Sequence, residues 1–550
     1  MTAVYWIIYR EGGGMSGLFA SYTTALARSG AFDEMFAPGH RARESYGHVA
    51  QALAELSLAD VKARGGLMAR SFLNRGVTFD FAGEERPFPL DIVPRVIAAD
   101  EWDVLERGVA QRVRALEAFL NDVYGPMKVV SDGVVPRKLI TTSAHFHRAV
   151  HGFDPAGGVR VHVSGIDVIR DAAGTFRVLE DNVRVPSGVS YVLENRRAMA
   201  KGLPEVMGQQ PIRPVEEYPR RLLSALRKTA PSGVLDPTVV VLTPGVFNSA
   251  YFEHTLLAGL MGVELVEGRD LICRGNHVFM RTTAGERRVD VIYKRIDDEF
   301  LDPLHFRADS MLGCPGLVNA ARAGGVTIAN AVGNGVADDK LIYTYLPDLI
   351  RYYLGEEPVI ANVDTFRLED KASLEEVLDR LDELVVKPVD GSGGKGLVIG
   401  PDASRAELAQ LRARLIEDPR GWIAQPVLQL STVPTMGGEK FGPRHVDLRP
   451  FAVNDGDDVW VLPGGLTRVA LKEGSLIVNS SQGGGSKDTW VLSSPQTDGP
   501  AAGVEEHAQA NAGGVPVGGP KPAPPVRESV SVWPVESNWR DNHAQKQQQQ

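Results

Sequence analysis

Cysteine is scarce in this sequence, and its scarcity excludes several kinds of protein. The 550 residues include only Cys273 and Cys314, and neither belongs to a CxxC motif or to a Cys/His spacing typical of zinc. Two cysteines cannot form the disulfide framework of a small secreted domain, so we expect a reducing, cytoplasmic location. Neither cysteine lies in a recognisable catalytic setting.

Long apolar runs are also missing. The segment Val4–Tyr9 is apolar, but it is too short to span a bilayer, and no small-residue cleavage site follows it. We therefore expect neither a membrane segment nor an export signal. The glycines that follow, together with Met15, leave open whether Met1 or Met15 is the natural start.

The chain has no excess of positive charge. Its formal net charge is −10, which argues against a broad basic face for non-specific binding of nucleic acid. Hydrophobic residues make up 43% and charged residues 23%, as in ordinary soluble globular proteins. A length of 550 residues predicts two or three lobes with a cleft between them. Residues 494–550 are rich in Ala, Gly, Pro and Gln, which predicts a disordered tail.

The apolar pattern predicts alternating helices and strands, which indicates an α/β fold. Helical segments are expected over residues 17–75, and a long amphipathic helix over Ile92–Tyr124. Strands are expected in the following segments: the hairpin Val77–Pro89, Val159–Val163, the hairpin of Ile166–Arg170 and Phe176–Leu179, Val239–Leu242, Glu264–Leu265 and Val289–Tyr293.

A glycine-rich loop lies between two predicted helices. Ser373 with Glu376, and Ser404 with Glu407, form capping-box sequences that predict where these helices begin. Between them, the segment LVVKPVDGSGGKG (Leu384–Gly396) begins as a strand, and a further apolar run follows it. The loop is therefore expected to join two strands.

The pattern GxGxxG in this loop fits three classes of phosphate-binding site, and the surroundings argue against each. A dinucleotide-binding turn runs directly into a helix, whereas a strand follows here. A Walker A loop requires Ser or Thr after its lysine, but Gly396 follows Lys395. A protein kinase would have HRD-type and DFG motifs, which the sequence lacks. What remains is a hairpin whose backbone N–H groups and Lys387 hold phosphates, or a surface hairpin without a ligand.

Several separated motifs are together more specific than the glycine pattern. They are LEDNVRVPSGVSY (Leu179–Tyr191), GNGVADDK (Gly333–Lys340), the loop above, Ala424–Pro426, HVDLRPF (His445–Phe451) and NSSQGGGSKDTW (Asn479–Trp490). In these motifs the sequence resembles the circularly permuted ATP-grasp type 2 proteins, which are related to the synthetase domain of glutathionylspermidine synthetase. The resemblance extends from about Val77 to Leu492.

The resemblance implies a circularly permuted ATP-grasp fold of the α/β class, with a nucleotide cleft between two α+β lobes. We expect this domain over residues 76–493, after an N-terminal extension and helical segment over residues 1–75. Its metal-binding part is expected at residues 140–200 and its ATP-binding part at residues 330–490. In an ordinary ATP-grasp chain the nucleotide lysines precede the metal ligands, and a circular permutation explains the reversed order here.

Three side chains near the first motif form a candidate magnesium site. Glu180 and Asn182 are two residues apart on a strand and so share a face, and Asp167 on the partner strand can face them. Carboxylate and amide oxygens are ligands that Mg²⁺ takes together with phosphate oxygens. The resemblance implies this role for Asp167, Glu180 and Asn182. The alternative is a set of polar residues on a solvated hairpin.

The resemblance also implies which residues bind ATP. Lys340 precedes a predicted helix and can reach the phosphates, while Gln425 lies where the chain links to the adenine pocket. The full set of expected ATP-binding residues is Lys340, Lys387, Gly391, Ser392, Gly393, Gly394, Gly396 and Gln425. A solvated lysine at a helix start is the alternative for Lys340.

Two arginines are candidates for neutralising charge on a transferred phosphoryl group. Arg449 and Arg468 each lie beside a predicted strand, and the sequence does not rank them. Either could instead be a partner in a structural salt bridge. A second glycine-rich stretch, Gln482–Lys487, could close over the site, contact the acceptor, or form a flexible loop at the domain end.

The sequence departs from the glutathionylspermidine synthetases in two respects. Gly165 stands where those proteins have an arginine, two residues before the first metal aspartate, which argues against an anionic thiol-peptide substrate. The sequence also contains no amidase domain with a nucleophilic cysteine.

The expected function is that of a Mg²⁺- and ATP-dependent carboxylate–amine ligase acting through an acylphosphate. Its substrates would be a small-molecule or peptide carboxylate and an amine, which the sequence does not identify. A nucleotide-binding scaffold or regulator without ligase turnover and a small-molecule phosphotransferase are the alternatives. We expect no nucleic acid or membrane partner, and the sequence leaves the oligomeric state open.

Overall fold

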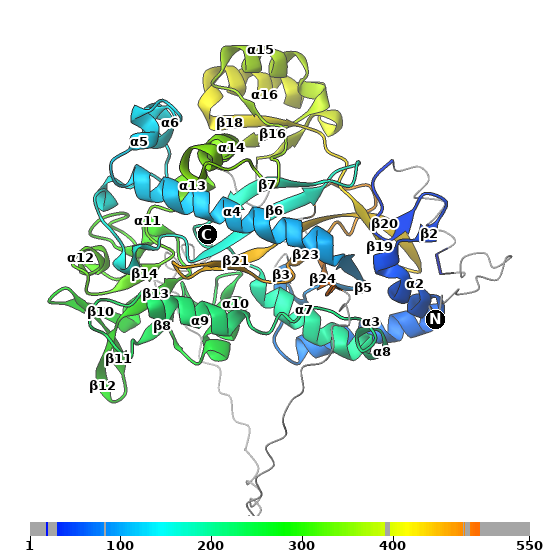
Figure 1. Ribbon diagram of the computed structural model, residues 1–550, viewed down its shortest axis with the longest axis horizontal. Coiled ribbons are helices and arrows are strands. Elements are labelled where there is room, and N and C mark those ends of the chain that lie inside the picture. The colour runs from blue at the N-terminus through cyan, green and yellow to red at the C-terminus, as the bar shows by residue number, and fades with distance from the viewer. Residues whose placement is uncertain are drawn as a thin grey trace, which may run out of the picture.

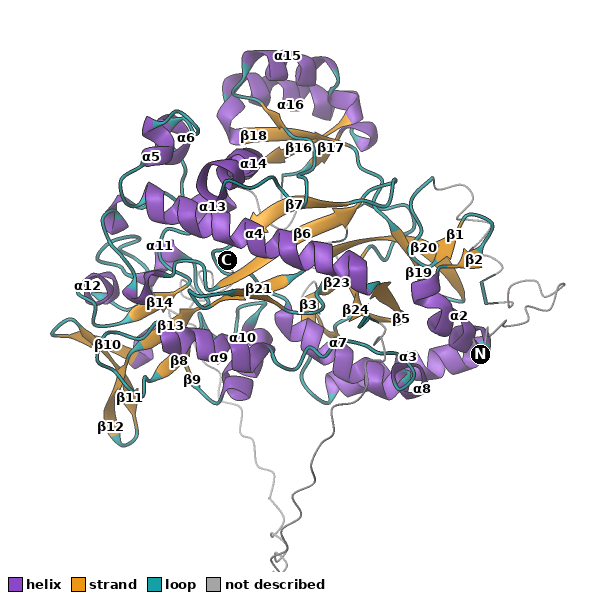
Figure 2. Cartoon of the chain, viewed as in Figure 1, coloured by secondary structure: helices purple, strands orange, loops and turns teal. Residues whose placement is uncertain are grey.

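The computed structural model describes residues 18, 19, 22, 30–81, 84–390, 396–476, 478 and 484–494, without the side chains of residues 79–81 and 84–86. The expected tail beyond residue 494 and both candidate start residues, Met1 and Met15, lie outside this description. Figure 1 shows how the elements are arranged, and Figure 2 shows them by type. No helix in the described ranges is long and apolar enough to cross a membrane.

A nine-stranded sheet forms the centre of the molecule. Its strands lie in the order β22-β21-β6-β20-β23-β24-β5, with β19 paired to β20 and β7 paired to β6. Their bounds are β5 (Leu90–Ile97), β6 (Val163–Arg170), β7 (Phe176–Asn182), β19 (Thr432–Gly437), β20 (Lys440–Arg449), β21 (Phe451–Asn454), β22 (Val459–Val461), β23 (Leu466–Val469) and β24 (Gly485–Val491). Because β5 and β24 are parallel neighbours, segments from distant parts of the chain meet in one sheet.

The two faces of this sheet pack into different cores. On β21, Ala452 packs with α4 (Ala99–Val123) and α14 (Lys340–Leu354), whereas Phe451 and Val453 pack with α7 (Val189–Gly202) and α9 (Tyr218–Lys228). This alternation follows from the two-residue period of a strand. In Figure 1, α4 crosses the sheet and lies beside α14.

A second sheet of four parallel strands, in the order β14-β13-β8-β9, lies beside the large sheet. A small antiparallel sheet, β10-β11-β12, projects from it (Figure 1). The bounds of these strands and their helices are β8 (Val239–Leu242), α10 (Tyr251–Met261), β9 (Glu264–Val266), β10 (Leu271–Arg274), β11 (His277–Thr282), β12 (Gly285–Val289), β13 (Val291–Lys294), α12 (Leu317–Arg322) and β14 (Thr327–Ala329). Short helices connect other elements: α5 (Lys128–Ser131), α6 (Arg137–Thr141), α8 (Pro204–Met207), α11 (Asp298–Leu301) and α13 (Gly335–Asp338).

Residues 366–426 form a small lobe with its own sheet and its own apolar core. The strands lie in the order β15-β18-β16-β17, and their pairs are antiparallel. The bounds are β15 (Phe366–Arg367), α15 (Lys371–Asp379), β16 (Leu384–Pro388), β17 (Val398–Ile399), α16 (Arg405–Glu417) and β18 (Trp422–Pro426). Every buried member of this core, from Leu368 to Ala424, comes from the lobe itself. The lobe lies above the large sheet in Figure 1.

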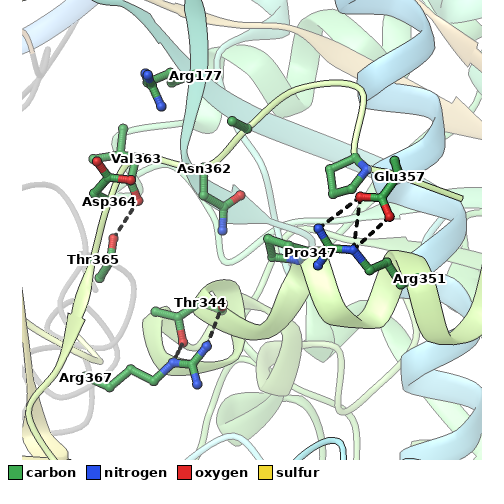
Figure 3. Close-up of a pocket in the computed structure, with 12 residues that line it drawn as sticks. Arg177, Thr344, Pro347, Arg351, Glu357, Asn362, Val363, Asp364, Thr365 and Arg367 are labelled. Carbon is green, nitrogen blue, oxygen red and sulfur yellow. Dashed lines mark hydrogen bonds and ion pairs between the residues drawn. The ribbon is translucent and has the colours of Figure 1, made fainter.

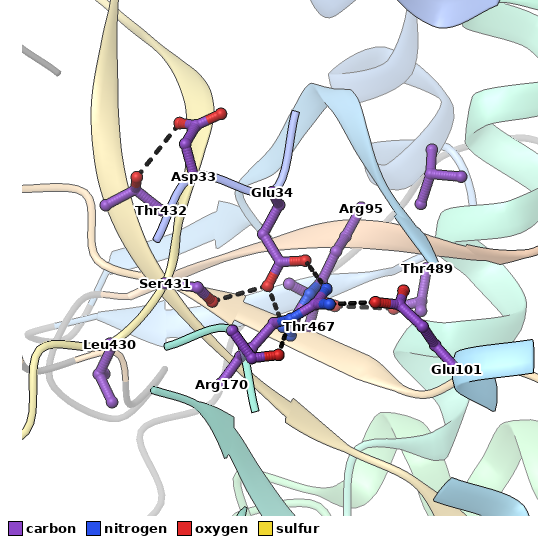
Figure 4. Close-up of polar contacts among 12 residues, drawn as sticks. Asp33, Glu34, Arg95, Glu101, Arg170, Leu430, Ser431, Thr432, Thr467 and Thr489 are labelled. Atoms are coloured by element: carbon purple, nitrogen blue, oxygen red, sulfur yellow. Dashed lines mark hydrogen bonds and ion pairs between the residues drawn. The ribbon is translucent and has the colours of Figure 1, made fainter. Parts of the chain in front are cut away.

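A buried ionic network anchors the N-terminal part of the chain (Figure 4). Glu34 accepts hydrogen bonds from Arg95, Arg170 and Ser431 at 2.6, 2.9 and 2.7 Å. Burial opposes ionisation of Glu34, but the two arginines hold its pKa below the ordinary value. One carboxylate therefore ties this segment to β5, β6 and the residue before β19. The elements of this part are β1 (Phe36–Ala37), β2 (Arg41–Ala42), α2 (Gly47–Ala54), α3 (Leu58–Leu73), β3 (Thr78–Phe81) and β4 (Glu84–Pro87).

Several predictions about local structure are confirmed. The hairpin expected over Val77–Pro89 is present as β3 and β4, and the hairpin around Gly174 is present as β6 and β7. The strands expected at Val239–Leu242 and Glu264–Leu265 are β8 and β9.

Other predictions about local structure are wrong in part. The long helix expected over Ile92–Tyr124 begins only at Ala99, because β5 occupies the preceding residues. Of Val159–Val163, only the last residue belongs to a strand, and Val289–Tyr293 is divided between β12 and β13. The helix expected to be capped by Ser373 is capped by Asp370, whose carboxylate accepts a hydrogen bond from the Ser373 N–H at 2.9 Å. The Ser404–Glu407 capping box of α16 is confirmed.

Candidate active site

The β6–β7 hairpin brings together the three residues expected to bind a metal. Asp167 pairs directly with Glu180 across the two strands, and Gly165 pairs with Asn182. Directly opposed side chains share a face, and so do residues two apart on one strand, so Asp167, Glu180 and Asn182 face the same way. Asp167 is 1% exposed, whereas Glu180 is 29% exposed.

Both candidate arginines bind the same carboxylate. Arg449 at the end of β20 donates to the two oxygens of Asp167 at 2.5 and 2.8 Å, and Arg468 on β23 donates to Oδ2 at 2.7 Å. Although burial opposes it, these guanidinium groups hold the pKa of Asp167 well below its usual range. Gly165 leaves the space for this arrangement, since a Cβ there would lie 3.1 Å from Cδ of Arg449.

Arg468 has a second acidic partner that the sequence did not indicate. Its Nε donates to Oδ1 of Asp447 at 2.9 Å, and the two residues are directly paired across β20 and β23. Asp447 was missed because nothing in HVDLRPF shows which strand it will face. The register of the two strands supplies that information.

Two lysines from later in the chain approach the carboxylates. Lys340, the first residue of α14, lies 4.0 Å from Oε2 of Glu180, and its Nζ is 3.4 Å from the carbonyl oxygen of Val389 in the small lobe. Lys387 on β16 donates to Oε1 of Gln425 on β18 at 2.7 Å. Burial lowers the pKa of Lys387 to about 8.

The segment just before Lys340 is held to the motif Leu179–Tyr191 by the carboxylate of Asp338. Asp338 accepts hydrogen bonds from the Val183 N–H at 2.6 Å and from Nε of Arg184 at 2.8 Å. Asp339 caps α14 by accepting from the Leu341 N–H at 2.9 Å. The sequence singled out this motif for Lys340, but it did not predict a role for either aspartate.

The glycine-rich loop joins two antiparallel strands, as expected from the sequence. Val385 pairs with Ile399 and Val386 with Val398. Gly396 has φ of +76°, a conformation that favours glycine. The other expected loop residues, Gly391, Ser392, Gly393 and Gly394, lie outside the described residues.

The second glycine-rich stretch leads into a buried strand. Lys487 lies on β24, is ion-paired with Asp91, and donates to the carbonyl oxygens of Val93 and Pro434 at 3.1 and 2.9 Å. Lys487 is fully buried and links β24 to β5 and β19. Gln482 lies outside the described residues.

A pocket of about 440 Å³ lies between α14 and the connection that enters the small lobe. Figure 3 shows Thr344, Thr365 and Arg367 on its wall, with Arg367 donating to Thr344. Thr365 also accepts a hydrogen bond from Nε2 of Gln425 at 2.9 Å. The pocket is therefore connected to Lys387 through two hydrogen bonds.

The three expected metal ligands suit a hard divalent cation. Burial and the adjacent Asp167 carboxylate raise the pKa of Glu180, so a cation next to Glu180 would stabilise its ionised form. Nδ2 of Asn182 is buried and has no hydrogen-bond partner within the described residues. No cluster of three or more His, Cys, Asp or Glu side chains suited to a metal occurs in the described part of the chain. The third ligand here would be an amide oxygen.

Comparison with known proteins gives close relatives of this chain. A protein of Mycobacterium leprae (strain TN), named as uncharacterised, is 61% identical over 475 residues, which cover 86% of this chain and 85% of that protein. A protein of Synechocystis sp., also named as uncharacterised, is 52% identical over 466 residues, which cover 84% of this chain and 97% of that protein. The "Putative glutamate–cysteine ligase 2-2" of Frankia casuarinae is 46% identical, covering 84% of this chain and 53% of that protein.

A solved structure of a glutathione synthetase-like effector from Globodera pallida, in apo form, overlays with a TM-score of 0.49 at 10% identity, covering 80% of this chain and 98% of that one. The family described as circularly permuted ATP-grasp type 2 matches residues 94–470, which include the carboxylates, both lysines and both arginines of the site. This chain belongs to the circularly permuted ATP-grasp type 2 family.

Proposed function

We propose that this chain is a Mg²⁺- and ATP-dependent carboxylate–amine ligase that forms an amide through an acylphosphate. The observation that carries the proposal is the convergence of Asp167 and Glu180 with Lys340, Arg449 and Arg468. These residues lie far apart in the sequence. Their meeting creates a site with both cationic and anionic groups, as a metal–nucleotide complex requires.

Each group has a distinct task in this proposal. Lys340 and Lys387 bind phosphate oxygens of ATP, and Arg449 offsets charge that develops on the transferred phosphoryl group. Asp167, Glu180 and Asn182 would hold Mg²⁺, which when bound supplies charge neutralisation at the phosphates. A carboxylate oxygen of the acceptor attacks the γ-phosphorus and ADP leaves. The amine then attacks the acyl carbon and phosphate leaves, so no protein nucleophile is needed.

Named relatives support a ligase rather than another use of the site. Two Frankia proteins at 46% identity carry a name that denotes a glutamate–cysteine ligase. This chain spans about half the length of those proteins, 53% and 54%. The identity of the acid and the amine is therefore left to experiment.

The nucleotide site can be tested by measuring ATP binding in the presence of Mg²⁺. Lys387→Ala should weaken ATP binding at least about tenfold, because a charge-assisted contact to phosphate is worth about 1.5–3 kcal/mol. Lys371→Ala is the matched control, since Lys371 is 90% exposed on the same lobe. Unchanged ATP binding by Lys387→Ala would remove this lysine from the site.

The reaction can be tested by screening amino acids and short peptides for ADP release. A ligase releases ADP only when a carboxylate and an amine are both present, and it forms an amide. A phosphorylated product without an amide would indicate a phosphotransferase. ATP binding without turnover across the screen would indicate a scaffold or regulator.

A further inference from the structure

The two cysteines of this sequence lie side by side. Cys273 is on β10, and Cys314 is in the loop between α11 and α12. They are 41 residues apart in sequence, yet their sulfur atoms are 3.5 Å apart, and both are free thiols. The chain contains no other cysteine with which either could pair within one molecule.

Glycines allow the two segments to approach this closely. A Cβ on Gly316 would lie 3.4 Å from Cβ of Cys273, so the chain just after Cys314 packs against the first thiol. A Cβ on Gly268 would come within 2.3 Å of the Leu312 carbonyl oxygen. The backbones are therefore packed with no space between them, and the thiols are held together by the fold.

The loop that carries Cys314 is fixed on both sides. The Cys314 N–H donates to the Leu301 carbonyl oxygen at 3.0 Å. The carboxylate of Asp302 accepts from the N–H groups of Gly316 and Val318 at 3.1 and 2.9 Å. These bonds hold the Cys314 sulfur near β10 without help from the thiols.

The two thiols differ in access to solvent. Cys273 is partly exposed, whereas Cys314 is buried in the core beneath the parallel sheet. The hydrogen bond between the sulfurs lowers the pKa of Cys273, which favours the nucleophilic thiolate at the accessible position. This is the arrangement of an attacking thiol with a resolving thiol behind it.

We propose that Cys273 and Cys314 form an oxidative modification site, at which a peroxide converts the pair to an intramolecular disulfide. The Cys273 thiolate attacks a peroxide oxygen, the O–O bond breaks and water leaves after protonation, giving a sulfenic acid. The Cys314 sulfur then attacks the Cys273 sulfur, the S–O bond breaks, and a second water leaves. Two thiols lose two electrons and two protons in total, and the peroxide is reduced to two water molecules.

Little movement is needed to form this bond. A disulfide has a sulfur–sulfur length of about 2.05 Å, so the atoms must approach by about 1.5 Å. Rotation about the side-chain bonds of the two cysteines can supply this. A dithiol reductant reverses the reaction by thiol–disulfide exchange.

The disulfide would join the β10–β12 sheet to the crossover between β13 and β14. A bridge between residues 273 and 314 closes a loop of the chain and reduces the freedom of its unfolded state. The oxidised protein should therefore melt several degrees higher than the reduced protein. Neither cysteine is among the residues assigned to the active site, so the proposal does not depend on the ligase assignment.

The full chain should be treated with hydrogen peroxide and measured by intact mass spectrometry. The expected product is a monomer about 2 Da lighter, from the loss of two hydrogens, with a linked 273–314 peptide that a dithiol releases. Cys314→Ser should show no such loss and should instead trap a sulfenic acid at Cys273, detected with dimedone. Cys273→Ser should resist both reactions, and neither variant should gain melting temperature on oxidation.

Two results would overturn the proposal, and both are measured with the wild-type protein. One is overoxidation of Cys273 to a sulfinic acid while Cys314 stays reduced. The other is a disulfide only between molecules, seen as a dimer on a non-reducing gel. Either result would show that the two sulfurs do not react with each other.

Discussion

Arg449 and Arg468 bind the same aspartate, and we propose different tasks for them because their surroundings differ. Arg468 is 9% exposed and bonded to both Asp167 and Asp447, so it links two buried carboxylates. Arg449 is 13% exposed, reaches the Ser187 carbonyl oxygen at 3.3 Å, and lies 3.9 Å from Glu180. We therefore propose a structural role for Arg468, whereas Arg449 lies near the partly exposed carboxylate of Glu180.

Replacing these arginines should separate the two tasks. Arg468→Ala leaves two buried carboxylates with one cation, and it should lower the free energy of unfolding by about 3–5 kcal/mol. Arg449→Ala leaves Asp167 paired with Arg468, so its loss of stability should be smaller, while nucleotide-dependent turnover falls. Urea denaturation measures the first effect and ADP release the second. Equal losses of stability in the two variants would contradict this division.

His162 should make the stability of the protein depend on pH. Its two ring nitrogens are buried and have no hydrogen-bond partner in the described ranges, and burial lowers its pKa to about 4. Between pH 6.5 and 4 the unfolded chain binds this proton and the folded chain does not. The contribution of His162 to the free energy of unfolding is therefore fully present above pH 6.5. It is lost as the pH is lowered toward 4, and the loss from this residue is at most about 3 kcal/mol.

A variant can isolate the contribution of His162. His162→Phe keeps an aromatic ring but cannot take up a proton, so it should flatten the decline in unfolding free energy between pH 6.5 and 4. The exposed His151 provides a matched control, and His151→Ala should leave the slope as in the wild type. Urea titrations at several pH values measure both slopes. An unchanged slope in His162→Phe would assign the acid sensitivity to other groups.

At the scale of elements, one arginine connects the small lobe to the helix that carries Lys340. Arg420, just before β18, donates to Oδ2 of Asp339 at 2.9 Å and to Thr142 and the Leu139 carbonyl oxygen at 3.1 and 3.2 Å. The other oxygen of Asp339 caps α14, as described above. A single carboxylate therefore holds both the small lobe and the first turn of α14.

Removing this contact should loosen the small lobe. Arg420→Ala loses a charge-assisted bond, so opening of residues 366–426 should become easier by about 1–3 kcal/mol. Hydrogen exchange measured by mass spectrometry should show faster exchange in those residues. Arg412→Ala is the control, because Arg412 bonds to the Leu378 carbonyl oxygen within the same lobe. Equal exchange in the two variants would show that Arg420 does not restrain the lobe.

Elements with a clear local signal were predictable from the sequence. The β6–β7 hairpin has a polar turn between two β-prone runs, and α16 has a capping box. The strand β5 was missed because its last six residues are all buried, so no alternation of polar and apolar residues marks it. Its partner β24 lies about 400 residues later in the chain, and no local pattern reveals such a pair.

The helix start at Asp370 shows a second limit. Both Asp370 and Ser373 are good capping residues, and each precedes an apolar helical pattern. The choice between them depends on where the preceding strand β15 ends. Arg420 shows the same limit, since an isolated arginine in a short 3₁₀-helix has no pattern that identifies its partner. Glu180, Lys340 and Lys387 became candidates because each lies in a recognisable motif, and Asp167 because it lies on the strand expected to pair with that of Glu180.

At the scale of the whole molecule, the candidate site is assembled from two parts of the fold. The carboxylates and arginines lie on the large sheet, whereas Lys387 and Gln425 lie in the small lobe. The lobe has its own core, although Val389 and Ile423 of the lobe pack into the core of the larger part. Parts with separate cores can open separately, and binding of a ligand between them favours the closed arrangement.

Substitutions in the two cores should therefore act on different parts of the protein. Leu411 and Leu105 are both almost fully buried, Leu411 in the small-lobe core and Leu105 on α4, in the core that this helix shares with the large sheet. Replacing either by Ala should cost about 2–5 kcal/mol. For Leu411→Ala, hydrogen exchange should accelerate in residues 366–426 and leave β6, β20 and β23 protected, while Leu105→Ala should expose the large sheet. If Leu411→Ala accelerated exchange equally in both parts, the molecule would unfold as one unit. Arg420 could then not restrain the small lobe separately from the rest of the chain.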